Sequence, residues 1–208
     1  MTYLAVAGNI GVGKTSLVNL LAQHFNWPVA PEPVTDNPYL PDFYHDMKRW
    51  AFHSQIYFLQ QRFEQTRKIT ESSQSVIQDR TLYEDQAVFA ANLHTSGLIS
   101  TRDYQNYLAL YHQLERLVQP PDLLIYIKAS VPVLQKRIDK RRKQQKERHY
   151  EQQIPEHYLQ QLNNKYEEWV SQYDKSPVIT LNGNEIDFIN RPEHTRCTIQ
   201  QIASAIGH

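Results

Sequence analysis

The sequence predicts an α/β fold in which a five-stranded parallel sheet is flanked by helices. Short apolar segments of strand length alternate along the chain with longer segments whose apolar residues recur at helical spacing. Residues 123–127, Leu-Leu-Ile-Tyr-Ile, form a continuous apolar run of the kind found in parallel strands that are buried on both faces. No internal repeat or low-complexity linker interrupts the chain, so we expect a single domain over residues 1–208.

The individual elements follow from these patterns. Apolar runs predict strands at residues 3–7, 28–30, 75–78, 123–127 and 178–181. Apolar residues at helical spacing predict helices at residues 16–25, 43–69, 84–93, 102–118, 133–146, 155–173 and 199–206. The proline-rich stretch 31–41 predicts a loop, and Pro120-Pro121 ends a helix before the fourth strand. Ligands of such sheets bind at the carboxyl ends of the strands.

Composition narrows the range of partners. The 22 basic and 22 acidic side chains cancel, which gives no general attraction to nucleic acid or to anionic membranes. No apolar run approaches the roughly 18 residues that a membrane-spanning helix needs. Cys197 is the single cysteine, which excludes an internal disulfide and suits a reducing compartment. We therefore expect a cytoplasmic protein with no nucleic-acid or membrane partner.

The segment from Gly8 to Ser16 carries the most specific motif. It matches the phosphate-binding pattern G-x-x-x-x-G-K-[ST] and stands between a predicted strand and a predicted helix, as the mechanism requires. Backbone N–H groups of such a loop bind phosphate oxygens, while Lys14 reaches the terminal phosphates and the Thr15 hydroxyl binds Mg²⁺. The residues expected to contact the nucleotide are Gly8, Asn9, Gly11, Val12, Gly13, Lys14, Thr15 and Ser16. The motif therefore predicts ATP as a ligand, together with Mg²⁺.

Three further charged residues fall at strand ends beside this loop. Glu32 lies between two prolines after the second strand and is a candidate base for an attacking hydroxyl. Asp79 ends the third strand, where its carboxylate is placed to hold Mg²⁺. Arg80 follows it and is placed to stabilise charge on a transferred phosphoryl group.

The helix predicted over 43–69 carries an unusual polar stripe. Tyr44, Ala51, Gln55 and Arg62 are spaced by seven, four and seven residues and should share one face. An amide, a phenol and a guanidinium on one stripe suit a partly buried pocket for a planar ligand. Glutamine can pair bidentately with an adenine-like edge.

A basic run follows the fourth strand. Eight lysines and arginines lie between Lys136 and Arg148. They form either a solvated helix face, an RNA-binding patch, or a lid that closes over phosphates at about residues 137–153. The phosphate-binding loop favours the lid.

These motifs together resemble the deoxyribonucleoside kinases, and among them the bacterial deoxyadenosine/deoxyguanosine kinases. The resemblance rests on the phosphate-binding loop and on Glu-Pro-Val at 32–34, Asn-Pro-Tyr-Leu at 37–40, Lys-Arg-Trp-Ala-Phe at 48–52 and Asp-Arg-Thr-Leu-Tyr-Glu-Asp at 79–85. It implies ATP-dependent transfer to the 5′-hydroxyl of a deoxyribonucleoside by a homodimeric enzyme.

The resemblance also implies roles for single residues. Glu32 would be the base, with Arg80 beside it and Lys14 on the phosphates. Tyr44 and Glu151 would hold the 3′-hydroxyl. The remaining implied contacts are Gln55, Arg62 and Asp85 to the base, Trp50, Phe52 and Phe89 around the nucleoside, Arg137, Arg141 and Arg148 in the lid, and Asp187 in the loop at the donor adenine.

Other functions remain open at this point. A nucleoside monophosphate kinase, such as a thymidylate kinase, would share the fold, but the Glu32 carboxylate would repel its phosphorylated acceptor. A GTPase-like switch lacks support because no N-K-x-D or D-x-x-G motif follows the loop. If Arg62 and Asp85 pair, they favour deoxyadenosine, with deoxyguanosine or deoxycytidine second and thymidine poor.

Overall fold

The predicted parallel sheet is confirmed by the computed structural model, which describes residues 1–33, 37–144, 154–188 and 191–207. The strands are β1 (Tyr3–Gly8), β2 (Val29–Ala30), β3 (Val76–Asp79), β4 (Leu123–Lys128) and β5 (Val178–Asn182). They are all parallel and lie in the order β2-β3-β1-β4-β5. The carboxyl ends of β1 and β3 are therefore adjacent, which brings the phosphate-binding loop next to Asp79 and Arg80.

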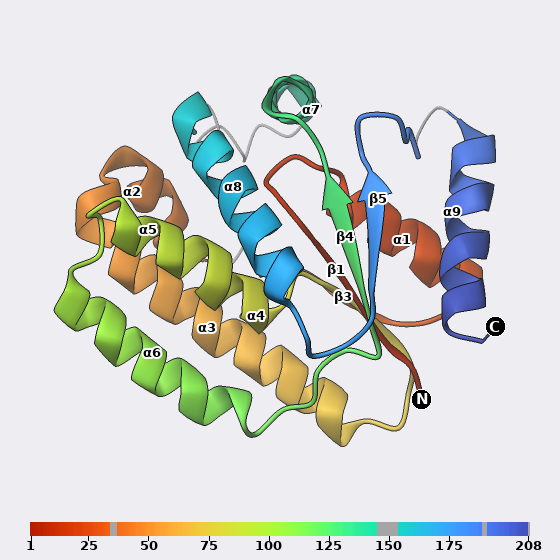
Figure 1. Cartoon of the computed structure of the whole chain (residues 1–208), viewed down its shortest axis with the longest axis horizontal. Helices are drawn as coiled ribbons and strands as arrows, with labels where there is room; N and C mark the ends of the chain where they lie inside the picture. Colours follow the sequence, from red (N-terminus) through yellow and green to blue (C-terminus); the bar gives the residue numbers. More distant parts are fainter. Residues whose placement is uncertain (34–36, 145–153, 189–190, 208) are drawn as a thin grey trace.

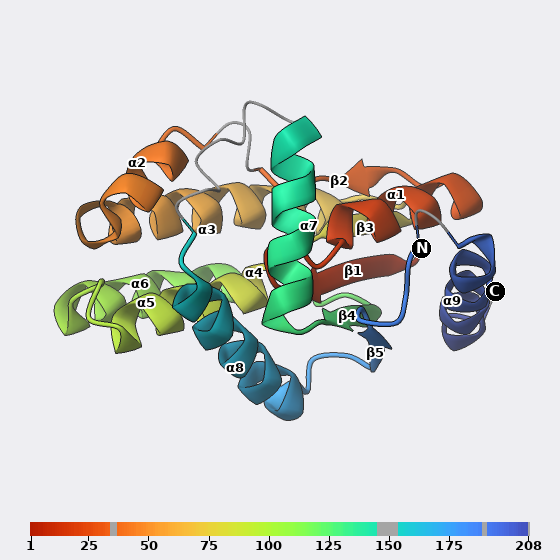
Figure 2. The same ribbon diagram turned by 90° about the horizontal axis from the view of Figure 1, so that it is seen from above.

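Helices cover both faces of the sheet. They are α1 (Lys14–Phe25), α2 (Leu40–His45), α3 (Met47–Glu71), α4 (Leu82–Glu84), the π-helix η1 (Asp85–Ala90), α5 (Ala91–Thr95), α6 (Thr101–Glu115), α7 (Val131–Gln144), α8 (Glu156–Gln172) and α9 (Pro192–Ala205). Helices α1 and α9 lie on one face, and α3, α5, α6 and α8 lie on the other (Figure 1). Helix α7 crosses above the carboxyl ends of the strands, as Figure 2 shows from above.

The core is divided by the sheet into two parts. In β1, Leu4 and Val6 pack toward α1, whereas Ala5 and Ala7 pack toward α3 and α8. All four side chains are fully buried. Burial on both faces explains why the strands read as continuous apolar runs rather than as alternating patterns. Within the described part of the chain, no helix has the length and apolar character needed to cross a membrane.

The single helix predicted over 43–69 is wrong, because the chain breaks at Asp46. The Asp46 carboxylate accepts a hydrogen bond from the backbone N–H of Arg49 at 3.1 Å and so caps a new helix, α3. Tyr44 consequently belongs to α2 and does not share a helical face with Gln55. A side chain that bonds locally to the backbone competes with continuation of a helix, and the apolar spacing alone does not reveal this.

Two helix starts also differ from the prediction. Helix α4 begins after Thr81, whose hydroxyl and backbone N–H form a reciprocal capping box with Glu84. Helix α9 begins at Pro192, where proline is well suited to the first turn, rather than at Ile199. The first turns of α9 are polar, so apolar spacing detects only the later part of the helix.

Candidate active site

A cavity of about 810 Å³ opens at the carboxyl ends of the strands, beneath α7. It is continuous from α3 at one end to the loop after β5 at the other. The predicted residues that line it are Gly11, Val12, Gly13, Lys14, Thr15, Ser16, Glu32, Tyr44, Gln55, Arg62, Arg80, Asp85, Phe89, Arg137, Arg141 and Asp187. Most of the sites expected from sequence therefore meet in one place.

The phosphate-binding loop has the geometry that its motif predicts. Gly13 adopts φ 104°, a left-handed conformation that favours glycine, directly before α1. No side chain caps α1, so the backbone N–H groups of its first turn are available to bind an anion. Lys14 is buried and its Nζ donates hydrogen bonds to the carbonyls of Gly8 at 2.9 Å and Asn9 at 3.2 Å. Burial, together with the Arg80 guanidinium, lowers the pKa of Lys14 to about 8.

Asn9 does not line the cavity, although the sequence placed it among the nucleotide contacts. Its Nδ2 donates to the carbonyl of Leu159 at 2.9 Å and to Asn163 Oδ1 at 2.7 Å, both on α8. Asn163 in turn donates to the carbonyl of Ala129 after β4 at 3.0 Å. The side chain of Asn9 thus fixes the loop to α8. Gly8 also lies outside the lining. A glycine is required there because a Cβ would meet the Ile127 carbonyl oxygen at 2.6 Å.

Thr15 and Asp79 form a direct contact beneath the loop. The Thr15 hydroxyl donates to Asp79 Oδ2 at 2.6 Å. The other oxygen, Oδ1, is buried and has no hydrogen-bond partner among the described residues. Burial and the neighbouring Glu32 carboxylate raise the pKa of Asp79. An unpaired buried carboxylate oxygen beside a threonine hydroxyl is a donor set suited to a hard cation.

Glu32 forms an ion pair with Arg80 at the centre of the cavity. The Arg80 Nε donates to Glu32 Oε1 at 2.6 Å, and Arg62 Nη2 lies 4.0 Å from the same oxygen. Burial alone would raise the pKa of Glu32, but the positive charges of Arg80 and Lys14 outweigh it and lower this pKa to about 2. The carboxylate is therefore ionised and oriented at neutral pH.

Tyr166 and Glu84, to which the sequence analysis assigned no role, hold Arg80 in place. Arg80 has a left-handed backbone with φ 74°, which is uncommon outside glycine. Its Nη1 donates to the Tyr166 hydroxyl at 2.6 Å, and this hydroxyl donates to Glu84 Oε2 at 2.6 Å. The guanidinium also lies 4.6 Å from the centroid of the Phe89 ring. Tyr166 comes from α8, so only the tertiary structure reveals its role.

Arg62 and Asp85 form the pair that the sequence analysis required. Arg62 Nε donates to Asp85 Oδ2 at 2.9 Å, and both side chains are buried. Arg62 Nη1 also donates to the carbonyls of Asp79 at 3.0 Å and Arg80 at 3.3 Å. Asp85 opens the π-helix η1, a type of distortion that is frequent at functional sites. Arg62 therefore holds in place both the Asp85 carboxylate and the carboxyl end of β3.

The aromatic residues expected around the nucleoside divide into two groups. Phe89 lines the cavity with Tyr44, whereas Trp50 and Phe52 are not part of its lining. Trp50 packs instead against the rings of Tyr39 and His53. The cavity residues that the sequence analysis did not assign to the site include Ser54, Phe58, Tyr158 and Phe188.

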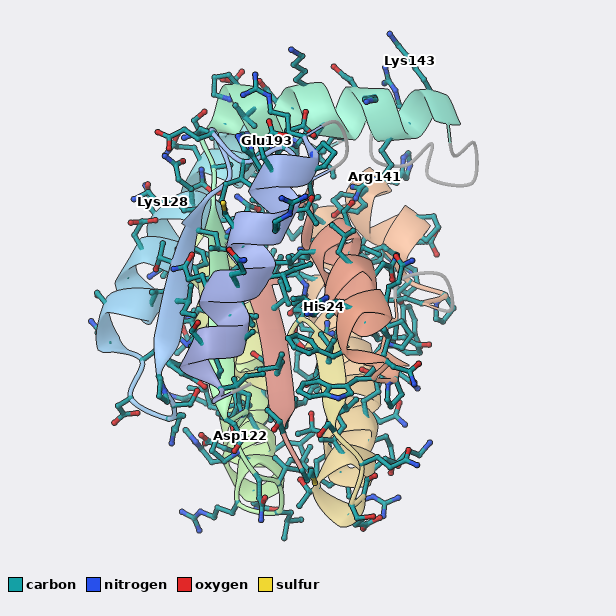
Figure 3. The ribbon with its side chains drawn as sticks, turned by 90° about the vertical axis from the view of Figure 1, so that its right-hand side faces the viewer. His24, Asp122, Lys128, Arg141, Lys143 and Glu193 are labelled. Carbon is teal, nitrogen blue, oxygen red and sulfur yellow. The ribbon has the colours of Figure 1, made fainter. Side chains whose placement is uncertain are left out.

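The basic helix α7 covers part of the cavity, and two of its predicted arginines line it. Arg137 and Arg141 both line it, but the Arg137 guanidinium donates to the carbonyls of Val12 at 2.6 Å and Gly183 at 2.7 Å. Arg137 thus ties the phosphate-binding loop to the loop that carries Asp187. Lys143 points away from the rest of the molecule, on the opposite side of α7 from Arg141 (Figure 3). Arg148 and Glu151 lie outside the described residues.

A phosphate-binding loop that faces a partly buried carboxylate paired with a buried arginine defines a P-loop phosphotransferase. A model of the deoxynucleoside kinase family matches residues 4–207, and the chain belongs to this family. The protein is accordingly an ATP-dependent kinase that phosphorylates deoxynucleosides.

Relatives and solved structures agree with this assignment. The chain is 36% identical over 207 residues to a deoxyadenosine/deoxycytidine kinase of Bacillus subtilis, covering 98% of this chain and 92% of that protein. It is 40% identical over 185 residues to a deoxyadenosine kinase of Dictyostelium discoideum, covering 88% and 73% respectively. The structure of deoxyadenosine kinase from M. mycoides with bound dATP superposes with a TM-score of 0.83 at 27% identity, covering 97% of this chain and 99% of that one.

Proposed function

We propose that the preferred acceptor is deoxyadenosine, with deoxyguanosine or deoxycytidine second and thymidine poor. The observation that carries this proposal is the buried Arg62–Asp85 pair beside Gln55. Together these side chains offer both donors and acceptors to the edge of a base that has an amino group. Thymine has no exocyclic amine and would leave buried polar groups unpaired, which a binding site penalises strongly. The names of relatives that act on deoxyadenosine support the same choice.

We propose roles for the site residues that the geometry of the cavity supports. The nucleoside would lie between α3 and η1, with Gln55 at the edge of the nucleobase, Phe89 against the face of a ring, and Tyr44 at the 3′-hydroxyl. Its 5′-hydroxyl would face Glu32. The triphosphate of ATP would rest on the phosphate-binding loop and Lys14, with Arg141 above it and Asp187 near the donor adenine. One continuous cavity then holds both reactants for in-line transfer.

Glu32 would act mainly by position and charge. A carboxylate with a pKa near 2 is a weak base in the ground state. Phosphoryl transfer has a loose transition state, so the hydroxyl proton need not leave before the phosphoryl group arrives. Glu32 orients the hydroxyl and accepts its proton late, while Arg80 stabilises charge on the transferred group.

Mg²⁺ would be held by Thr15 and Asp79. The unpaired Oδ1 of Asp79 and the neighbouring hydroxyl fit a cation that takes one or two protein ligands and completes its shell with phosphate oxygens and water. The ion would neutralise charge on the phosphates. Within the described part of the chain, no cluster of three or more His, Cys, Asp or Glu side chains offers another metal site.

We also propose a homodimer in a cytoplasmic location. Helices α3 and α6 pack side by side outside the sheet, and Leu110 of α6 is 40% exposed there (Figure 1). Light scattering would give the mass in solution, and cell fractionation would give the location.

A substrate panel tests the acceptor. Turnover of labelled ATP is compared across the four deoxynucleosides, adenosine and the deoxynucleoside monophosphates. We expect the highest kcat/KM for deoxyadenosine and little transfer to adenosine or to monophosphates. Equal efficiency on thymidine and deoxyadenosine would contradict the base preference, while leaving the family assignment intact.

A further inference from the structure

Helix α3 carries a buried hydroxyl inside the substrate cavity. Ser54 is 0% exposed and lines the cavity together with Gln55, Phe58 and Arg62. These four residues lie at the spacing of one helical stripe. Among the described residues, the Oγ of Ser54 has no hydrogen-bond partner.

Other hydroxyls of the same helix behave differently. Thr66 and Thr70 each donate to the carbonyl four residues earlier, at 2.9 Å, which is the ordinary way for a helical hydroxyl to be satisfied. Ser54 does not make this bond. A buried hydroxyl without a partner costs free energy, and its position in the cavity lining offers it to a ligand.

We propose that Ser54 recognises the base of the nucleoside by donating a hydrogen bond to a ring nitrogen that Gln55 leaves unpaired. This inference rests on the proposed acceptor, a purine deoxynucleoside. A glutamine amide satisfies the amino group and one adjacent ring nitrogen of adenine. Adenine has further ring nitrogens that only accept, and a serine hydroxyl is a donor that can turn toward them.

The first experiment replaces Ser54 by alanine. Ser54→Ala removes only the hydroxyl, and alanine is favoured in helices. We expect kcat/KM for deoxyadenosine to fall by about tenfold, the size of one hydrogen bond to a buried group. The unfolding midpoint of the free enzyme should not fall, because the hydroxyl has no protein partner to lose. Ser171→Ala on α8 is the matched control, since its hydroxyl donates to the Glu168 carbonyl at 2.8 Å on the exposed surface. An unchanged kcat/KM in Ser54→Ala would overturn the proposal.

The second experiment identifies the atom. The unmodified enzyme and Ser54→Ala are compared on 1-deaza-, 3-deaza- and 7-deaza-2′-deoxyadenosine, each of which lacks one ring nitrogen. We expect both enzymes to have the same efficiency on one of the three analogues, because the acceptor is already absent. A tenfold loss on all three would show that the hydroxyl does not bind a ring nitrogen. The base panel on the unmodified enzyme is scored separately, so failure of the purine preference is distinguishable from failure of the Ser54 contact.

Discussion

The phenol of Tyr166 lies between Arg80 and Glu84, accepting from the first and donating to the second at 2.6 Å each. All three side chains are buried. Arg80 also has an unfavourable left-handed backbone, so its orientation depends on these partners. Because Tyr166 belongs to α8, packing of α8 on the sheet determines where the arginine points.

Replacing Tyr166 by phenylalanine should therefore lower kcat by about tenfold and destabilise the fold by about 1.5–3 kcal/mol, the usual range for hydrogen bonds to charged groups. The ring packing remains, so the protein should still fold. Steady-state kinetics and urea unfolding measure the two effects. Tyr126→Phe is the control, because its hydroxyl donates to Glu167 outside the cavity. Equal kcat values for Tyr166→Phe and the unmodified enzyme would show that Arg80 is held without the phenol.

Lys14→Ala should abolish phosphoryl transfer and leave the fold intact. Lys14 is charged below its pKa of about 8 and loses the charge above it. Affinity of the unmodified enzyme for a non-hydrolysable ATP analogue should therefore fall as pH rises through 8, whereas that of Lys14→Ala should stay level. Calorimetric titrations between pH 7 and 9 would show this. A variant with near-normal turnover would contradict the assignment of the phosphate-binding loop.

Glu32→Gln should lower kcat by about a hundredfold, within the range for loss of a general base. The amide can still accept from Arg80 and from the nucleoside hydroxyl, so nucleoside affinity should change much less. Because the pKa of Glu32 is about 2, its carboxylate stays ionised between pH 7 and 5, and this group causes no loss of activity there. Glu167→Gln, outside the cavity, is the control. Parallel losses in kcat and affinity would indicate a role in binding only.

Asp79→Asn should raise the Mg²⁺ concentration needed for half-maximal activity. Asparagine can keep the hydrogen bond from Thr15 but offers the cation no negative charge. Titration of activity with MgCl₂ at fixed ATP measures the change. Asp122→Asn is the control, since Asp122 lies near the opposite end of the sheet (Figure 3) and bonds to the Tyr3 N–H. An unchanged Mg²⁺ requirement would remove Asp79 from the metal site.

The double variant Arg62→Met with Asp85→Ala should shift preference toward thymidine. Arg62→Met alone should destabilise by about 3–5 kcal/mol because it leaves Asp85 buried and unpaired. The double variant should be more stable than this single variant, although the carbonyls of Asp79 and Arg80 still lose their donor. Denaturant unfolding of both variants and a base panel test these points. No gain in the thymidine-to-deoxyadenosine ratio would contradict the account of base selection.

The parts of the site that could be predicted are those fixed by local sequence. The loop at 8–16 and the charged residues at strand ends need only the strand pattern and the rule that parallel strands present their carboxyl ends together. Tyr166 and Asn163 could not be found in this way, because nothing in α8 distinguishes them before the helix packs against β1 and β4. The cap at Asp46 could not be predicted from the apolar spacing for a different reason. A short polar side chain ends one helix and starts another without disturbing the apolar spacing around it.

The continuity of the cavity has a consequence for inhibition. Because Gln55 and Asp187 line one uninterrupted space, the proposed roles of these residues imply that a single molecule that joins two nucleosides through a chain of phosphates would have both ends bound at once. After one end binds, the other is held at a high effective concentration, so the joined compound gains affinity over its halves without any new contact. The number of bridging phosphates that gives the tightest complex would then measure, in solution, the separation at which the enzyme holds its two reactants.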